Sequence, residues 1–390
     1  MLSPVHACSS AAPSWLRMFT AAALPLALLA VILLQPLAAR GQSRTALSSQ
    51  TAMYGRLVRL EHGANNGRIL ASVTAFPNGG NEIDIYSSSD NGQTFSPLSS
   101  ITDPQFAGGL CCGTLYELPG AVGNLPAGTV LWAGSVGQNT SPHQMEIKVY
   151  QTADGGQRWS YLSNCVNTTN PGGLWEPQFN IANDGALVCH WSDETDTAYS
   201  QKLARARTYD GVTWQDESNT VASDIQADRP GMAVVTLLPS GTYFMSYELC
   251  GPAACTVFYR TSTDGWNWGD PTFTGTKVAA ASGQFFEHAP TNAYSANGQL
   301  LLVGQVLLNS DGSTASGNGE TIFTNTSADG RGTWQTQAAP VPVPDAQNAV
   351  CPNYSSPLLP SIDGISVLGL ASDTVAATAS CTSVRSPCSN

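Results

Sequence analysis

The 390-residue sequence has few charged residues, which make up only 11% of it. Its 16 Lys and Arg are outnumbered by 28 Asp and Glu, which gives a formal net charge of −12. Because no basic stripe is available to neutralise phosphates, we expect no nucleic-acid partner. The five His are scattered and no C-x-x-C pair occurs, so the sequence predicts no metal site and no cofactor.

Long apolar runs are also scarce. One such run, "AAALPLALLAVILL" at 21–34, follows a basic residue and precedes small residues. This order is typical of a secretory signal peptide over 1–41, cleaved after Ala39 or Gly41. The alternative is an uncleaved anchor, but Pro25 makes the run a poor membrane span. We therefore expect a secreted, extracellular protein without stable membrane association.

An oxidising environment would allow disulfides among the ten cysteines. Cys250 and Cys255 flank a tight "GPAA" loop, so we predict that they pair. Cys111 and Cys112 are adjacent, and we expect no bridge between them. The Ser/Thr/Cys-rich tail, 376–390, contains a further candidate pair, Cys381 and Cys388. Four N-x-S/T patterns predict glycosylation, at Asn139, Asn167, Asn325 and Asn353.

A short polar motif recurs five times along the chain. Each copy has Ser or Thr two residues before an Asp, then a Gly and an aromatic residue. The copies are "SSSDNGQTF" (87–95), "QTADGGQRW" (151–159), "RTYDGVTW" (207–214), "TSTDGWNW" (261–268) and "TSADGRGTW" (326–334). An Asp side chain can accept hydrogen bonds from the backbone N–H groups ahead of it and close a turn. Five such turns at intervals of 54 to 65 residues predict a repeat architecture.

A second series of turns joins β-rich apolar runs. These turns lie at Gly67, Gly128, Gly185, Gly241, Gly298 and Gly364. Each unit then reads as four antiparallel strands, which is the blade of a β-propeller. We predict an all-β, six-bladed propeller over 42–375, in which the segment before Met53 supplies an outer strand to the last blade. A β-helix or a pair of β-sandwiches is the alternative.

Propeller geometry selects the candidate site. The first strand of each blade lines the channel, and it starts where the second strand ends. Those positions offer Arg56, Cys111, Cys112, Glu176, Arg229, Glu287, His288, Tyr354 and Glu248, and less surely His190 and Trp191. We predict that Arg56, Arg229, Glu287, His288, Tyr354 and Trp175, which precedes Glu176, bind substrate.

Glu176 and Glu248 lie on neighbouring blades and are predicted to face each other. Two facing carboxyl groups, one protonated and one ionised, are the apparatus of glycoside hydrolysis. Apolar neighbours flank both residues, so the sequence alone leaves their two roles open.

The repeated Asp motif on a six-bladed propeller resembles the sialidase superfamily. Within it, "YGRLVRLEHGANNGRILASVTAF", "WEPQF" and "DRPGMAVVTLLPSGTYFMSYE" are similar to the exo-α-1,5-L-arabinanases of glycoside hydrolase family 93, over about residues 50–370. The resemblance implies a secreted, retaining, metal-independent enzyme that attacks linear arabinan from its non-reducing end. It implies Glu176 and Glu248 as the catalytic pair, and we assign Glu176 as the nucleophile and Glu248 as the acid/base.

Two other functions stay open. A sialidase would need three arginines on the substrate carboxylate and a Tyr nucleophile; Arg56, Arg229 and Tyr354 are suitably placed, but the third arginine is missing because Arg260 lies too far out. A non-catalytic carbohydrate-binding propeller would need no paired Glu. In each case we expect a poly- or oligosaccharide partner and a monomer.

Overall fold

The computed structural model describes residues 44–77, 80–327, 329–349, 351–374 and, for the backbone alone, 381–389. They belong to one compact unit, Gly41–Asn390. The predicted signal peptide lies outside the described residues. Within those residues the secondary structure is β-strands and three short 3₁₀ helices, η1 (Gly63–Asn65), η2 (Pro104–Gly108) and η3 (Gly251–Ala253). In the same part of the chain, no helix has the length and apolar character needed to cross a membrane.

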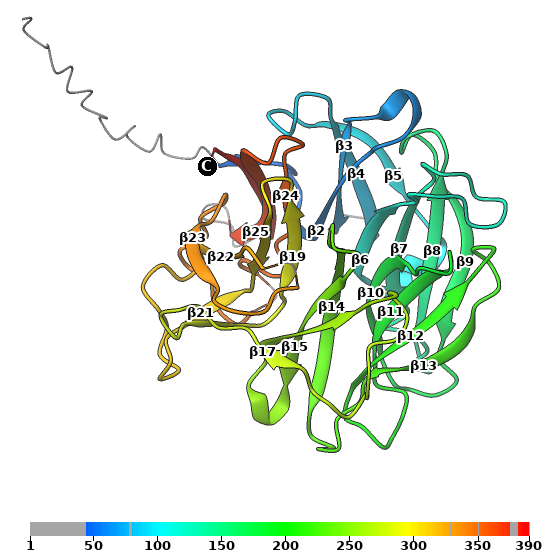
Figure 1. Cartoon of the computed structure of the whole chain (residues 1–390). Helices are drawn as coiled ribbons and strands as arrows, with labels where there is room; N and C mark the ends of the chain where they lie inside the picture. The colour runs from blue at the N-terminus through cyan, green and yellow to red at the C-terminus, as the bar shows by residue number, and fades with distance from the viewer. Residues whose placement is uncertain (1–43, 78–79, 328, 350, 375–380, 390) are drawn as a thin grey trace, which may run out of the picture. The chain divides into compact units, whose positions relative to one another are not determined.

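The strands form antiparallel sheets that follow one another along the chain, as the colour gradient of Figure 1 shows. Sheet 1 contains β2 (Ala52–Arg59), β3 (Ile69–Ala75), β4 (Glu82–Ser88) and β5 (Ser96–Ile101). Sheet 2 contains β6 (Leu110–Glu117), β7 (Val130–Val136), β8 (Glu146–Thr152) and β9 (Ser160–Asn167). Sheet 3 contains β10 (Leu174–Ile181), β11 (Leu187–Asp193), β12 (Lys202–Thr208) and β13 (Gln215–Val221).

The later sheets depart from this simple order. Sheet 4 contains β14 (Arg229–Leu237), β15 (Tyr243–Cys250) and β16 (Thr256–Ser262), extended by β17 (Thr276–Lys277), β18 (Phe285–Glu287) and β21 (Val306–Leu308). Sheet 5 contains β19 (Thr291–Ser295), β20 (Gln299–Val303), β22 (Thr321–Asn325) and β23 (Gln335–Ala338). Sheet 6 contains β24 (Leu358–Pro360), β25 (Ser366–Thr374), β26 (Cys381–Ser389) and, on its outer edge, β1 (Thr45–Ala46).

Sheet 6 combines both ends of the described chain. Thr45 and Ala46 pair with β26, so the segment before Met53 does supply an outer strand. The backbone of 381–389, which we expected to belong to a tail, continues the sheet by pairing with β25. The predicted Cys381–Cys388 pair concerns side chains outside the described ones.

The first strands of successive sheets contact each other: β2 with β6, β6 with β10, β10 with β14, β14 with β19, β19 with β24, and β24 with β2. Figure 1 shows these strands around the middle of the unit. Four-stranded antiparallel sheets whose first strands meet in this way make a β-propeller. The arrangement brings residues that are far apart in the sequence to one central region.

Local chemistry explains the sheets. Each of the six turn glycines has a positive φ, between 69° and 91°, which L-residues disfavour. The recurring Asp side chains accept backbone N–H groups as expected, for example Asp210 from Val212 at 2.8 Å and from Thr213 at 2.6 Å. Apolar residues between neighbouring sheets form the core, and Trp132, Trp191 and Phe244 are among its largest fully buried side chains.

In three disulfides, both cysteines are among the residues whose side chains are described. Cys250 is joined to Cys255, and Cys165 on β9 is joined to Cys189 on β11, which links sheets 2 and 3. The third joins Cys111 to Cys112. Our expectation that these adjacent residues do not bridge each other was wrong. At Cys112 the chain has a φ of 64°, within a β-bulge, and this local backbone geometry accommodates the bridge.

Candidate active site

Each sheet has a non-glycine residue of positive φ near the start of its first strand, within the strand in sheets 1 to 4 and two or three residues before it in sheets 5 and 6. These residues are Tyr54, Cys112, Glu176, Met232, Ala289 and Ser355, with φ between 48° and 64°. In the first four sheets the residue lies within a β-bulge, where the pairing register shifts. A bulge re-aims a side chain, and non-glycine residues adopt positive φ only rarely. The repeated irregularity therefore marks the position at which each sheet presents a side chain to the central region, and Glu176 is the one carboxylate in this set.

Glu176 lies on β10 and is mostly buried. Its Oε2 atom accepts a hydrogen bond from the Ser192 hydroxyl at 2.6 Å. The Ser192 oxygen in turn accepts the backbone N–H of Met232 at 3.1 Å. Burial raises the pKa of Glu176 to about 7, the charge of Glu194 adds to this rise, and the Ser192 hydrogen bond opposes it.

Glu248 lies near the end of β15, and its side chain is only 12% exposed. Its Oε2 atom accepts the backbone N–H of Ala289 at 2.7 Å and lies 3.8 Å from Nδ1 of His288. Burial raises the pKa of Glu248 to about 8, and the charge of Glu176 raises it further. Because each carboxyl responds to its surroundings and Glu248 also responds to Glu176, the two form an interacting pair.

Two tyrosines and a methionine lie against this pair. The rings of Tyr54 and Tyr354 have centroids 6.1 Å apart, and the Tyr354 hydroxyl lies 3.4 Å from the sulfur of Met232. Burial raises the pKa of Tyr54 to about 12 and that of Tyr354 well above its usual range, and the charges of both Glu176 and Glu248 contribute. Both phenols are therefore neutral at physiological pH.

Arg229 forms a second part of the site. Its guanidinium donates to the carboxylate of Glu194, to Oε1 of Gln201 at 2.8 Å and to the carbonyl of Ser200 at 2.9 Å. Glu194 also accepts the indole N–H of Trp175 at 2.9 Å. Glu194 thus orients two of the predicted substrate-binding residues, and the Arg229 side chain remains 38% exposed.

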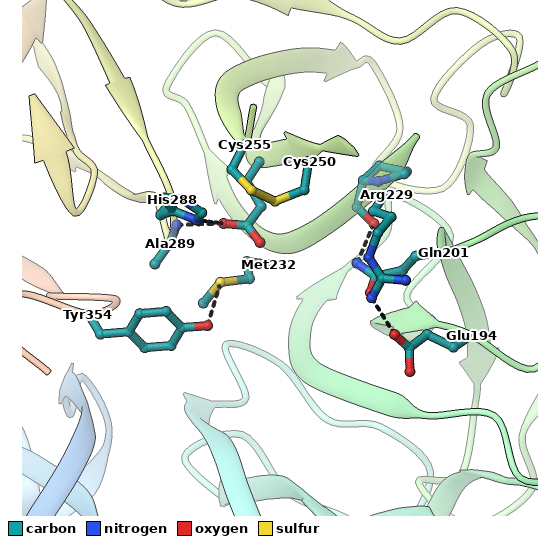
Figure 2. The surroundings of a disulfide bond; sticks show 11 residues. Glu194, Gln201, Arg229, Met232, Cys250, Cys255, His288, Ala289 and Tyr354 are labelled. Atoms are coloured by element: carbon teal, nitrogen blue, oxygen red, sulfur yellow. Dashed lines mark hydrogen bonds and ion pairs between the residues drawn. A yellow bond between two sulfur atoms is a disulfide. The ribbon is translucent and has the colours of Figure 1, made fainter. Parts of the chain in front are cut away.

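Figure 2 shows the Cys250–Cys255 disulfide between these two parts, with His288 and Ala289 on one side and Arg229, Gln201 and Glu194 on the other. The ligand atoms of Glu248, Cys250, Cys255 and His288 lie within 4.8 Å of one another, which is close enough for a metal site. Zinc binds cysteine as thiolate, however, and here both sulfurs are joined in the disulfide. As long as the two cysteines form this disulfide, the four residues therefore do not fit a metal ion.

The other predicted site residues differ in their surroundings. Arg56 lies over the Tyr54 ring at 4.1 Å, and its guanidinium donates to the carbonyls of Gly55 and Ser355 and to the Ser355 hydroxyl. Glu287 lies on β18, not on the first strand of a sheet, and the charge that acts on its carboxyl is that of Lys277. Arg56 is therefore engaged with the protein, and Glu287 belongs to the extension of sheet 4.

His190 and Trp191 do not reach the site. Both are fully buried, and His190 bonds to Oδ1 of Asn180 at 2.8 Å. The second strand runs on to Asp193, so the residues that reach the site are Ser192 and Glu194, beyond the two we expected. Arg260 is buried too and donates to backbone carbonyls, in keeping with its predicted place away from the site.

Two of the four predicted glycosylation sites are buried. Asn325 and Asn353 are only 3% and 4% exposed, and the side-chain nitrogen of each donates to backbone carbonyls. A glycan would have to replace these hydrogen bonds and enter the core. Asn139 and Asn167 are exposed, and their glycosylation stays a prediction.

We compared the chain with protein-family models, with curated protein sequences and with solved structures. No protein-family model matches the chain, and no curated protein sequence matches it. The structure is similar to that of the Penicillium chrysogenum α-L-arabinanase complexed with arabinobiose, with a TM-score of 0.72 and 25% identity over 89% of this chain and 97% of that one. It is also similar to the family 93 α-L-arabinofuranosidase of Fusarium graminearum with arabinobiose, with a TM-score of 0.69 and 24% identity over 87% and 93% of the two chains.

A more distant similarity is to the NanB sialidase of Streptococcus pneumoniae, with a TM-score of 0.54 and 12% identity over 91% of this chain and 70% of that one. The predicted resemblance to family 93 and to the sialidase fold is thus confirmed at the level of structure. The two similar structures named first, the arabinanase and the arabinofuranosidase, are glycoside hydrolases.

Proposed function

We propose that this chain is a secreted, retaining glycoside hydrolase that acts on the end of linear α-1,5-L-arabinan. One observation carries the proposal. Glu176 and Glu248 are two mostly buried carboxyl groups that interact, and burial raises their pKa values to about 7 and about 8. A pair of carboxyls, one protonated and one ionised, is what hydrolysis of a glycosidic bond requires. The arabinobiose-bound relatives indicate the sugar.

The surroundings favour Glu248 as the acid/base. Burial raises its pKa, and the negative charge of Glu176 raises it too, so an ionised Glu176 favours the protonated form of Glu248. Glu176 receives a hydrogen bond from the Ser192 hydroxyl, and the N–H of Met232 also stabilises its anion. A stabilised carboxylate next to a protonated carboxyl matches nucleophile and acid.

The reaction then runs in two steps. In the first, Glu248 gives its proton to the glycosidic oxygen while an oxygen of Glu176 bonds to the anomeric carbon, so that the C–O bond to the leaving sugar breaks and an ester forms. In the second, the Glu248 carboxylate takes a proton from water, and the water oxygen displaces Glu176 from the same carbon. The proton ends on Glu248, the sugar carries the new hydroxyl, and the configuration is retained.

Arg229 and Trp175 supply the binding contacts in this proposal. Glu194 holds both side chains, which reduces the freedom they lose when substrate binds. The partly exposed guanidinium has donors left for sugar hydroxyls. Arg56 acts indirectly, by fixing Tyr54 and Ser355.

The sialidase alternative finds less support. Arg56 is engaged with backbone and side-chain oxygens of the protein and Arg260 is buried, so of these three arginines Arg229 is the one with donors left for a substrate carboxylate. Burial also keeps the Tyr354 phenol neutral, so it is a poor nucleophile.

We further propose that sheets 1 to 6 are the blades of a six-bladed propeller and that the mature, monomeric protein starts at Arg40 or Gln42. The closed series of contacts between first strands supports the first point. N-terminal sequencing and size-exclusion chromatography of secreted material test the others. Intact Met1 in a membrane fraction would contradict secretion.

The test of function is a substrate panel of linear arabinan, debranched arabinan and a sialoside, assayed for released sugar. Wild type should act on the arabinans. Glu176→Ala and Glu248→Ala should each lower kcat/KM at least roughly a thousandfold, which corresponds to about 4 kcal/mol of barrier. Glu287→Gln is the matched control, because its carboxyl faces Lys277, and it should change kcat/KM less than about threefold. If neither Ala variant loses more than about tenfold, the carbohydrate-binding alternative replaces the hydrolase.

A further inference from the structure

The disulfide between Cys111 and Cys112 lies at the repeated bulge, on the first strand of sheet 2. Cys112 is the counterpart in that sheet of Glu176 in sheet 3, and β6 contacts β10 directly. The two residues therefore occupy equivalent positions in neighbouring sheets.

The disulfide belongs to the apolar wall around the two carboxyls. Cys112 packs in one cluster with Tyr54, Met232 and Ala289, and Cys111 and Tyr354 pack against that cluster. The N–H of Ala289 binds Glu248, and both catalytic carboxyls act on the pKa of Tyr354. The disulfide thus packs with residues that bind or interact electrostatically with the two carboxyls.

Stability does not explain this bridge. A disulfide stabilises chiefly by restricting the unfolded chain, and the effect shrinks as the enclosed loop shortens. No residue lies between Cys111 and Cys112, so this effect is at its smallest. The Cys165–Cys189 bridge, with a sequence separation of 24 and a link between two sheets, is the one suited to that role.

The residue that follows the pair has a packing constraint of its own. At the next residue, Gly113, a Cβ would lie 2.4 Å from the Trp132 indole, so only glycine lets that ring pack beneath the bulge. Two adjacent linked cysteines close a small ring through the peptide bond between them, and the CH₂–S–S–CH₂ edge of that ring carries no N–H or O–H group. Such a ring is a fixed, apolar and polarisable surface.

We infer that the Cys111–Cys112 disulfide is a substrate-contact surface, on which the C–H face of the sugar joined to Glu176 packs. The inference rests on the proposed function and adds to it a contact between the sugar and this disulfide. Sugar rings offer C–H groups as well as hydroxyls, and an apolar surface beside the catalytic pair accepts the former without leaving a polar group unpaired. An L-arabinofuranosyl unit is the ligand that the proposed function supplies.

A first experiment compares two disulfide-free variants, Cys111→Ser/Cys112→Ser and the control Cys165→Ser/Cys189→Ser, by kcat, KM and Tm on linear arabinan. In the first variant KM should rise at least about tenfold, while kcat and Tm change little. The control should lower Tm and leave KM within about twofold. A KM within twofold of wild type in the first variant would overturn the inference.

A second experiment needs no variant and therefore does not depend on folding. Wild type is treated with a phosphine reductant and iodoacetamide, with and without arabinobiose, and the labelled cysteines are quantified by mass spectrometry. Arabinobiose should slow labelling of Cys111 and Cys112 at least about fivefold and leave Cys165 and Cys189 unaffected. Equal labelling with and without the sugar, in a protein that hydrolyses arabinan, would contradict the contact alone. A wild type that neither hydrolyses arabinan nor gains protection would remove the proposed function as well.

Discussion

Replacing Glu248 by Gln should stabilise the protein at high pH while it abolishes turnover. The amide has the shape of the carboxyl, and its carbonyl oxygen can still accept the N–H of Ala289, which lies 2.7 Å from Oε2 in the wild type. What it removes is a buried group that must ionise as the pH rises. The substitution therefore isolates the free-energy cost of that charge.

The direction and size of the effect follow from the pKa. Below pH 4.5 the Glu248 carboxyl is protonated in both folded and unfolded chains, so wild type and variant differ little. Between pH 4.5 and about 8 the unfolded chain ionises while the folded one keeps its proton, so stability falls as the pH rises. At 1.36 kcal/mol per pKa unit, the cost grows from about 1 kcal/mol at pH 5 to about 5 kcal/mol at pH 9.

Thermal unfolding followed by circular dichroism measures this cost. For a chain of this size each kcal/mol corresponds to roughly 1.5 °C, so Glu248→Gln should raise Tm by about 1 °C at pH 5 and by roughly 7 °C at pH 9. Glu320→Gln, at an exposed glutamate just before β22, is the control and should show no such trend. A Tm difference that is equal at both pH values, or that shrinks as the pH rises, would refute the reasoning.

Three further predictions follow from the site. The pH profile of kcat/KM should be bell-shaped, with an acid limb near 7 from Glu176 and a basic limb near 8 from Glu248, and a flat profile across this range would contradict the pairing. Ser192→Ala removes the hydrogen bond that lowers the pKa of Glu176, so the acid limb of the kcat/KM profile should move to higher pH by about one unit. An unmoved limb would mean that this hydrogen bond does not lower the pKa of Glu176. Cys250→Ser/Cys255→Ser should lower kcat at least about tenfold, but it should lower the free energy of unfolding by well under the roughly 3 kcal/mol expected for a disulfide that closes a 15-residue loop. An unchanged kcat with a large fall in Tm would mean that this disulfide stabilises the fold and does not position Glu248.

Much of the fold could be predicted because its signals are local. The Asp turns and glycine turns depend on neighbouring residues, and they gave the strand order of the regular sheets. The extension of sheet 4 could not be predicted, because β17, β18 and β21 are two or three residues long and show no period. Glu287 was misplaced for that reason.

The site residues could be predicted where the propeller geometry alone determines their positions. Glu176 and Glu248 come together because they lie on adjacent sheets, at the same end of antiparallel strands. Glu194 was missed because β11 runs two residues further than its apolar pattern suggests. Tyr54 and Met232 were missed because nothing in their residue type indicates a bulge. In three sheets, however, a small residue directly follows the residue of positive φ: Gly55, Gly113 and Ala233.

The central claim is that Glu176 and Glu248 divide the work of a retaining hydrolase, and the anomeric configuration of azide products tests it most directly. With Glu248→Ala, added azide should replace the missing base in the second step and give an arabinosyl azide of retained configuration, resolved by NMR. With Glu176→Ala, azide should attack directly and give the inverted product. Exchanged outcomes would reverse the two roles. The absence of any azide product from either variant, with wild type also giving inverted sugar, would contradict the account.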